Sequence, residues 1–232
     1  MQNVVYHFRF ADGQSASCAV DADASPEPAE LPAWTALGCQ QCANCPLQPA
    51  SSPHCPMAVR FVPLVAIMGK LRSYDQVETR VDMAERSISK HTTVQRGVGA
   101  LMGLLAASSA CPHADFLRPM AHFHLPFATE EETIYRAAST YLLAQYFLAR
   151  QGGVPDWELH GLKARYQALQ SVNAAMASRL RQAVDEDGAI NGLIILDLLA
   201  KALPYSIDDK LDDIKAAFGG AEPRGAARVQ PG

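Results

Sequence analysis

The segment VVYHFRFADGQSASCAV, residues 4–20, has the clearest structural pattern at the start of the chain. Apolar and polar side chains alternate on both sides of Asp12-Gly13, a dipeptide typical of tight turns. This period of two predicts a β-hairpin with one apolar face. Cys18 falls on that face, where a free cysteine commonly serves as a small core residue.

A second alternating pattern surrounds residues 85–86, and its first strand carries apolar or β-branched side chains on one face. They are Val77, Thr79, Val81 and Met83. A single hairpin is barely stable in water, so we expect both hairpins to share one four-stranded antiparallel sheet. Between the hairpins, residues 57–72 have the apolar spacing of a helix, with Pro63 near its first turns.

The chain beyond the second hairpin is predicted to be helical. Residues 98–110 are apolar enough to predict a buried core helix, which is well short of the roughly 20 residues that a membrane span needs. Gly99, Gly103 and Ala107 recur every four residues along one side of it. Another helix could approach that side closely, because almost no side chain stands in the way.

Cap and turn signals divide the helices that follow. Thr129 and Glu132 form a capping box that starts a helix, which the glycines at 152–153 end. Proline is favoured in the first turn of a helix, so Pro155 is expected to open the next one. That long helix is expected to end at residues 187–188.

The last helical stretch contains a proline, which predicts two helices. A very apolar helix is expected over residues 190–203, and Pro204 is expected to end it. Ser206 and Asp209 then have the spacing of a cap that starts a short amphipathic helix.

These patterns together predict an α+β fold. An N-terminal antiparallel sheet of two hairpins, a cysteine-rich metal loop and one helix occupy residues 1–96, and a helical region follows over 97–218. Residues 22–32 are acidic and proline-rich and are expected to be a linker. Residues 219–232 lack an apolar face and are expected to be a disordered tail.

Composition limits the classes of protein that the chain can represent. It has 232 residues, 49% of them hydrophobic, and a net charge of −4 at pH 7, so it can bury a core and is not intrinsically disordered in bulk. The charge gives no reason to expect binding to nucleic acid or an anionic membrane. The start of the chain lacks the layout of a signal peptide, so we expect a cytoplasmic protein with reduced thiols. The sequence is compatible with a homo-oligomer.

Four of the six cysteines lie in one short segment, GCQQCANCPLQPASSPHCPMA. They are Cys39, Cys42, Cys45 and Cys55, with the spacing C-x2-C-x2-C-x9-C. In a cytoplasmic chain, four thiols so close together indicate a metal site more than disulfides. The residues between them build turns and no core, so such a loop would be held in shape by its metal.

The spacing leaves two metals open. The three cysteines at i, i+3 and i+6 are similar to the bacterial ferredoxin run, which slightly favours a [4Fe–4S] cluster. Zn²⁺ is the alternative, and His54 could replace one cysteine in a zinc site. With four protein ligands neither metal would keep an open coordination position, which indicates a structural or electron-carrying centre.

A second group of titratable residues lies in a loop rich in proline and phenylalanine. Its candidates for catalysis are Cys111, His113, His124 and Glu131. A cysteine beside a histidine could act as nucleophile and base, and two histidines with a carboxylate could bind another metal. The simpler interpretation is that the glutamates favour a helix N-terminus and the histidines bond to loop carbonyls.

The segments QCANCPL, HCPMA, ERSISKHTTVQRG, SACPH, FHLPFATEEETIYRAAS and YLLAQYF resemble an uncharacterised family of bacterial proteins. The resemblance covers about residues 34–147, including a four-cysteine cluster and a CPH…FHLPF…EET motif. It implies that the cysteine cluster and the stretch 111–136 belong to one functional unit.

Two functions follow from these features. The first is a non-catalytic regulatory or interaction module, built round four cysteines that hold [4Fe–4S] or Zn²⁺ and acting on an unidentified protein partner. The second is a redox enzyme, in which an iron–sulfur centre exchanges electrons with a site near Cys111, His113 and His124.

Overall fold

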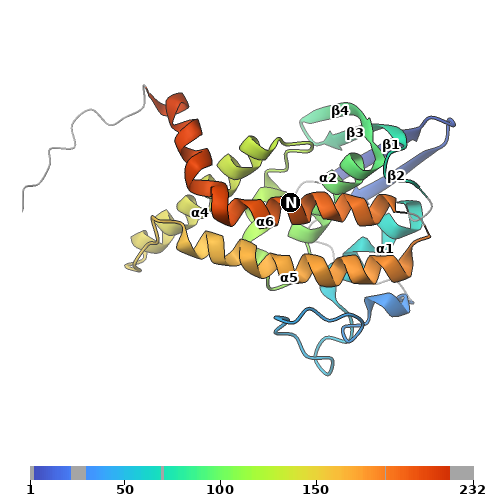
Figure 1. Cartoon of the computed structure of the whole chain (residues 1–232), viewed down its shortest axis with the longest axis horizontal. Helices are drawn as coiled ribbons and strands as arrows, with labels where there is room; N and C mark the ends of the chain where they lie inside the picture. The colour runs from blue at the N-terminus through green and yellow to red at the C-terminus, as the bar shows by residue number, and fades with distance from the viewer. Residues whose placement is uncertain (1–2, 22–29, 69–70, 186, 220–232) are drawn as a thin grey trace, which may run out of the picture.

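The computed structural model of the chain describes residues 3–21, 30–68, 71–185 and 187–219 (Figure 1). The strands are β1 (Val4–Phe10), β2 (Ser15–Val20), β3 (Gln76–Met83) and β4 (Arg86–Thr93). The helices are α1 (Pro56–Met68), α2 (Val94–Ala107), α3 (Arg118–His122), α4 (Glu130–Arg150), α5 (His160–Ala183) and α6 (Gly188–Lys215). Short 3-10 turns lie at Ala33–Thr35, Asp115–Leu117 and Ala216–Phe218. The fold is α+β, as the sequence predicts.

The two predicted hairpins form one antiparallel sheet with the strand order β2-β1-β3-β4. In the register of this sheet Tyr6 lies between Cys18 and Val81. All three side chains are buried on the apolar face, and Cys18 is a core residue there. The opposite face carries polar side chains such as His7 and Arg80.

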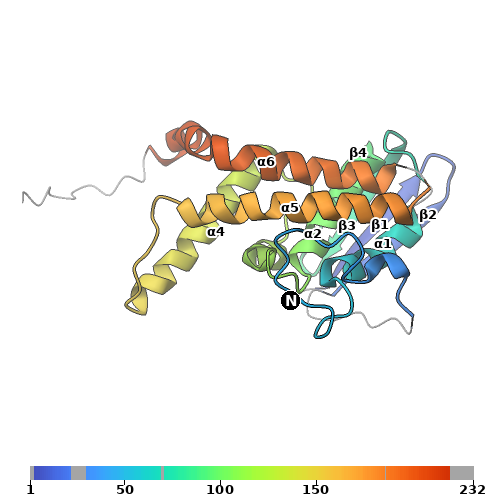
Figure 2. The ribbon, with the colours of Figure 1, turned by 60° about the horizontal axis from the view of Figure 1, so that its bottom comes forward.

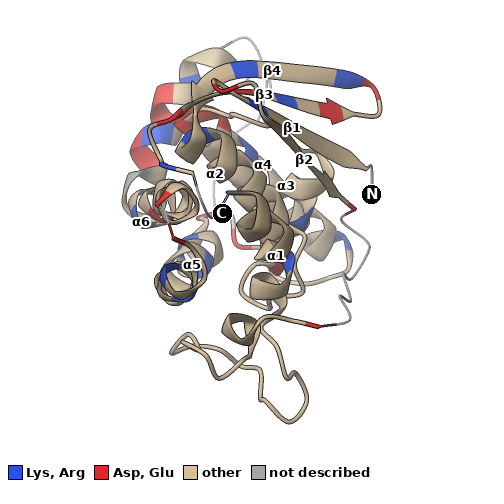
Figure 3. Ribbon diagram, turned by 90° about the vertical axis from the view of Figure 1, so that its right-hand side faces the viewer, with Lys and Arg blue, Asp and Glu red and all other residues tan. Residues whose placement is uncertain are grey.

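Helices cover the apolar face of the sheet. Figure 3 shows α2 between the sheet and the pair formed by α5 and α6, with the cysteine loop at the opposite edge of the molecule. The predicted close approach occurs where Gly99 of α2 meets Gly192 of α6. A Cβ atom on Gly99 would lie 3.1 Å from the carbonyl oxygen of Gly192. A Cβ atom on Gly103 would lie 3.7 Å from Leu196, which is an ordinary contact, so the tight approach is confined to one turn.

The expected break at Pro204 is wrong, because α6 runs without interruption from Gly188 to Lys215. Leu203 and Ile207 on either side of the proline are fully buried. Burial of this face outweighs the backbone hydrogen bond that the proline removes, and no separate helix starts at Ser206. Figure 1 shows α6 changing direction in its last third, as a proline inside a helix explains.

The expected start of α5 at Pro155 is also wrong, because that helix begins at His160. The carboxylate of Asp156 accepts hydrogen bonds from the Gly161 N–H at 2.7 Å and from the Tyr141 hydroxyl at 2.9 Å. These bonds hold the chain after Pro155 in a loop against α4, so the helix starts one turn later.

The capping box that the sequence predicts for α4 is present. The Thr129 side chain accepts from the Glu132 N–H at 3.1 Å, and the Glu132 carboxylate accepts from the Thr129 N–H at 2.7 Å. Residues 22–29 of the expected linker and residues 220–232 of the expected tail lie outside the described residues.

Among the described residues, one helix is long and apolar enough to cross a membrane by length and composition alone, over the window Gly188–Tyr205 of α6. In this structure α6 packs against α2 and α5 and buries Leu193, Ala200 and Leu203. Apolar side chains of α6 are therefore part of the hydrophobic core.

Candidate metal centre

The cysteine segment is a loop whose two ends are tied together. An isolated β-bridge joins Ala36 to His54, and the Leu37 N–H donates to the Pro53 carbonyl at 2.8 Å. The Cys55 N–H donates to the Thr35 carbonyl at 2.8 Å, directly before α1 begins. The loop over residues 37–53 therefore leaves the body of the protein and returns to it at one neck.

Polar contacts fix the loop on α5 and on the turn after α2. The Asn44 side-chain amide donates to the Ala168 carbonyl of α5 at 2.9 Å. The backbone carbonyl oxygen of Asn44 accepts a hydrogen bond from His113 Nε2 at 2.7 Å. Figure 2 shows the loop lying along α5 beside the start of α1. The resemblance to a family implies that residues 111–136 and the cysteines form one unit, and the His113 contact joins the two segments physically.

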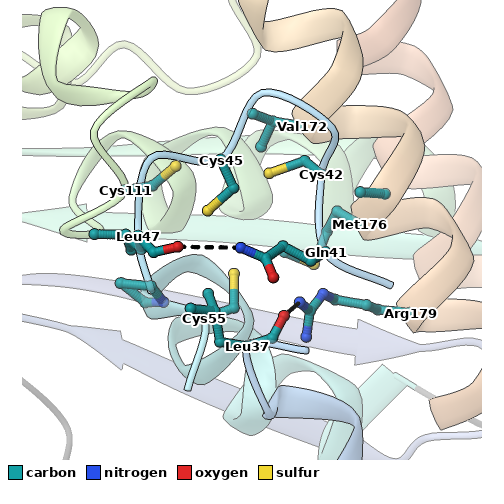
Figure 4. Close-up of a pocket in the computed structure, with 12 residues that line it drawn as sticks. Leu37, Gln41, Cys42, Cys45, Leu47, Cys55, Cys111, Val172, Met176 and Arg179 are labelled. Atoms are coloured by element: carbon teal, nitrogen blue, oxygen red, sulfur yellow. Dashed lines mark hydrogen bonds between the residues drawn. The ribbon is translucent and has the colours of Figure 1, made fainter. Parts of the chain in front are cut away.

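Four thiols surround one cavity beneath this loop. They belong to Cys42, Cys45, Cys55 and Cys111, and Figure 4 shows their sulfur atoms directed toward a common space. Three separate segments supply them: the loop itself, its return to α1, and the turn that follows α2. All six cysteines of the chain are free thiols.

The cavity is small and has mostly apolar walls. Apolar side chains line it together with the thiols: Leu37, Leu47 and, on α5, Val172 and Met176. The space open to the centre of a water molecule measures about 20 Å³. A space of this size holds roughly one or two water molecules, so an organic substrate of ordinary size does not fit in it.

Burial controls the protonation of the two most perturbed thiols. It raises the pKa of Cys42 to about 12, and the nearby thiols of Cys45, Cys111 and Cys55 add to the effect. Burial likewise raises the pKa of Cys111 to about 11, although the backbone N–H groups of His113 and Ala114 act in the opposite direction. Without a bound cation these thiols hold their protons at neutral pH, so neither is an activated nucleophile.

Cys39 does not line the cavity. Its thiol donates to the Gln182 side-chain oxygen on α5 at 3.4 Å. His54 is also outside, since its Nδ1 atom is hydrogen-bonded to the Thr35 hydroxyl at 2.9 Å. The cysteines that gather therefore differ by one from the set that the spacing predicts, with Cys111 in the place of Cys39.

The catalytic candidates of the second group are separated from one another. Cys111 and His113 belong to the cavity and its loop, as described above. His124 Nε2 instead shares a hydrogen bond of 2.7 Å with the Tyr6 hydroxyl, under the sheet. Burial, with a smaller effect of Arg136, lowers the pKa of His124 to about 4, so the ring is neutral at pH 7. Glu131 is exposed in the first turn of α4.

Within the described part of the chain, no group of three or more His, Cys, Asp or Glu side chains could hold a single metal ion as the atoms now lie. A tetrahedral zinc site needs Zn–S bonds of about 2.3 Å, which places its sulfur atoms about 3.8 Å apart. The four thiols lie round a common space (Figure 4).

The sequence carries one signal that links Cys111 to the cysteines of the loop. Cys45, Cys55 and Cys111 are each followed by proline, whereas Cys39 and Cys42 are not. A Cys-Pro step also ends the ferredoxin run to which the loop was compared. Cys111 therefore has the same Cys-Pro dipeptide as two cysteines of the distant cysteine segment.

The fold and the thiols define an α+β protein with a candidate metal centre between a loop and a helical body. A family model described as Domain of unknown function (DUF6901) matches residues 4–219, and the chain belongs to that family. This confirms the expected membership of an uncharacterised family. No curated protein and no solved structure matches the chain.

Proposed function

We propose that this protein binds a [4Fe–4S] cluster through Cys42, Cys45, Cys55 and Cys111 and serves as a regulatory or interaction module. The observation that carries the proposal is the gathering of four thiols from three segments round one small cavity. Cys18 shows what a cysteine used for packing looks like here, because it lies alone among apolar side chains of the sheet.

Two features favour a cluster over a single zinc ion. A cubane holds its thiolates further apart than one ion does, which suits thiols arranged round a space. The backbone N–H groups of His113 and Ala114 lie close enough to the Cys111 thiol to lower its pKa, and N–H groups near sulfur are a means by which proteins tune such clusters. Zn²⁺ on the same four cysteines is the alternative.

The closed coordination of the centre supports a role without catalysis. Four cysteines for a four-iron cluster leave no iron open to a substrate, and the cavity has no room for one beside the metal. The loop has few apolar side chains of its own, so gain or loss of the cluster would change the order of this face of the molecule. A protein or redox partner in the cytoplasm would detect that change.

Metal analysis of the wild-type protein tests this proposal. Protein purified without oxygen should be brown, absorb broadly in the visible range and contain about four iron and four sulfide ions per chain. Removal of the iron should make residues 36–54 sensitive to a protease that leaves the sheet and helices intact. A colourless protein with about one zinc per chain would end the iron–sulfur version.

A further inference from the structure

Arg179 of α5 is among the largest fully enclosed side chains of the protein, at 2% exposure. Its guanidinium donates to three backbone carbonyls at the neck of the cysteine loop, those of Trp34 at 2.8 Å, Ala36 at 2.7 Å and Leu37 at 2.9 Å. The same side chain lines the cavity that the four thiols surround (Figure 4). A permanent positive charge therefore lies buried beside the candidate metal centre.

No carboxylate neutralises this charge within the part of the chain that the structure describes. The ion pairs found there involve other arginines, lysines and histidines, and every hydrogen bond of Arg179 ends on a neutral carbonyl. Carbonyl dipoles offset only part of the cost of removing a full charge from water. An anion close to a buried guanidinium that has no acidic partner would offset the remaining cost of its burial.

We propose that Arg179 is the counter-charge of the metal centre and sets its reduction potential. This inference rests on the proposed function. Four thiolates carry a charge of −4, and a [4Fe–4S] core in its oxidised 2+ state leaves the centre with a net charge of −2. Arg179 supplies the compensating charge, and it is the only basic side chain among the described residues that line the cavity.

The redox consequence follows from charge alone. One electron from a low-potential donor such as dithionite takes the core from 2+ to 1+ and the whole centre from −2 to −3, with no bond made or broken. A nearby cation stabilises the more negative state, and the apolar walls of the cavity strengthen the attraction. Arg179 therefore raises the reduction potential and keeps the centre reducible despite its burial.

The test compares three variants of the cluster-loaded full chain. Arg179→Met removes the charge and keeps the length of the side chain, and Arg179→Lys keeps the charge but loses the planar fork. Arg181→Met removes an equal charge from an exposed position two residues further along the same helix. The midpoint potential of each is measured by following the visible absorption during a reductive titration.

We expect Arg179→Met to make reduction less favourable by about tenfold in the equilibrium constant, which is about 59 mV for one electron. Arg179→Lys should retain most of the wild-type potential, and Arg181→Met should not shift it, because water and salt screen an exposed charge. If Arg179→Met does not hold a cluster, Arg179→Lys provides the test. A cluster in Arg179→Lys with a midpoint potential near that of the wild type would support the same role for the charge.

Two results would overturn the inference. One is a potential for Arg179→Met that equals those of wild type and Arg181→Met. The other is loss of the cluster from both Arg179→Met and a folded Arg179→Lys, because Arg179 would then serve only as an anchor for the loop carbonyls. A wild-type protein without iron refutes the proposed function first, so the two failures are distinguishable.

Discussion

Acidification should destabilise this protein through His124. Its ring is neutral in the folded state because burial, aided by Arg136, lowers its pKa from the ordinary value of 6.5 to about 4. Below pH 6.5 the unfolded chain takes up a proton that the folded chain refuses, so the free energy of unfolding falls as the pH drops. The 2.5-unit difference corresponds to a total loss of about 3 kcal/mol by pH 4, at 1.36 kcal/mol per unit.

Urea unfolding of the wild type and of His124→Gln measures this effect. Between about pH 7.5 and pH 5 the wild type should lose about 2 kcal/mol more than the variant, which has no titrating ring at this position. His122→Gln is the control, since it changes an exposed histidine two residues earlier and should keep the acid sensitivity of the wild type. Equal losses for the wild type and His124→Gln would show that the His124 ring is not the source of the acid sensitivity.

The same residue tests whether the two titratable groups share one site. His124 contacts Tyr6 of the sheet and does not line the thiol cavity, so His124→Ala should leave the iron content unchanged. Loss of iron in a variant that still folds would show that His124 contributes to the metal centre.

Two further predictions concern the helices. Gly192→Ala places a methyl group 3.0 Å from Val98 Cγ1 and 3.2 Å from backbone atoms of α2, so thermal unfolding should show a loss of about 1–3 kcal/mol. Gly103→Ala is its matched control, because the nearest atom to the new methyl group is 3.7 Å away and the helix should gain up to about 1 kcal/mol. Thr129→Ala should cost about 1 kcal/mol through the lost cap of α4, and Thr129→Ser should recover most of it; an unchanged melting temperature in Thr129→Ala would contradict this.

Short-range patterns predicted much of the fold. Alternation over residues 4–20 and 76–93 predicts both hairpins and their shared sheet, because a one-sided strand can bury only one set of side chains. The capping box at Thr129 is equally local. The helix boundaries expected at Pro204 and Pro155 are wrong for the same reason, because tertiary contacts outweigh a local preference. Neither the packing round Leu203 nor the bonds to Asp156 can be deduced from neighbouring residues.

The candidate site was predictable only in part. The crowding of thiols in one segment predicts a metal site, and three of the four cysteines of that prediction line the cavity. The replacement of Cys39 by Cys111 depends on how the turn after α2 packs against the loop. Arg179 could not be recognised either, because a basic residue in a helical stretch gives no sign that it will be buried beside thiols.

The iron content of two single variants shows which cysteines hold the metal. Cys111→Ser and Cys39→Ser are purified without oxygen alongside the wild type, and circular dichroism establishes that each is folded. We expect Cys111→Ser to lose its iron and visible absorption while Cys39→Ser keeps both, since Cys111 lines the cavity and Cys39 does not. Iron retained in Cys111→Ser and lost in Cys39→Ser would contradict the account and assign the metal to the set that the spacing alone predicts.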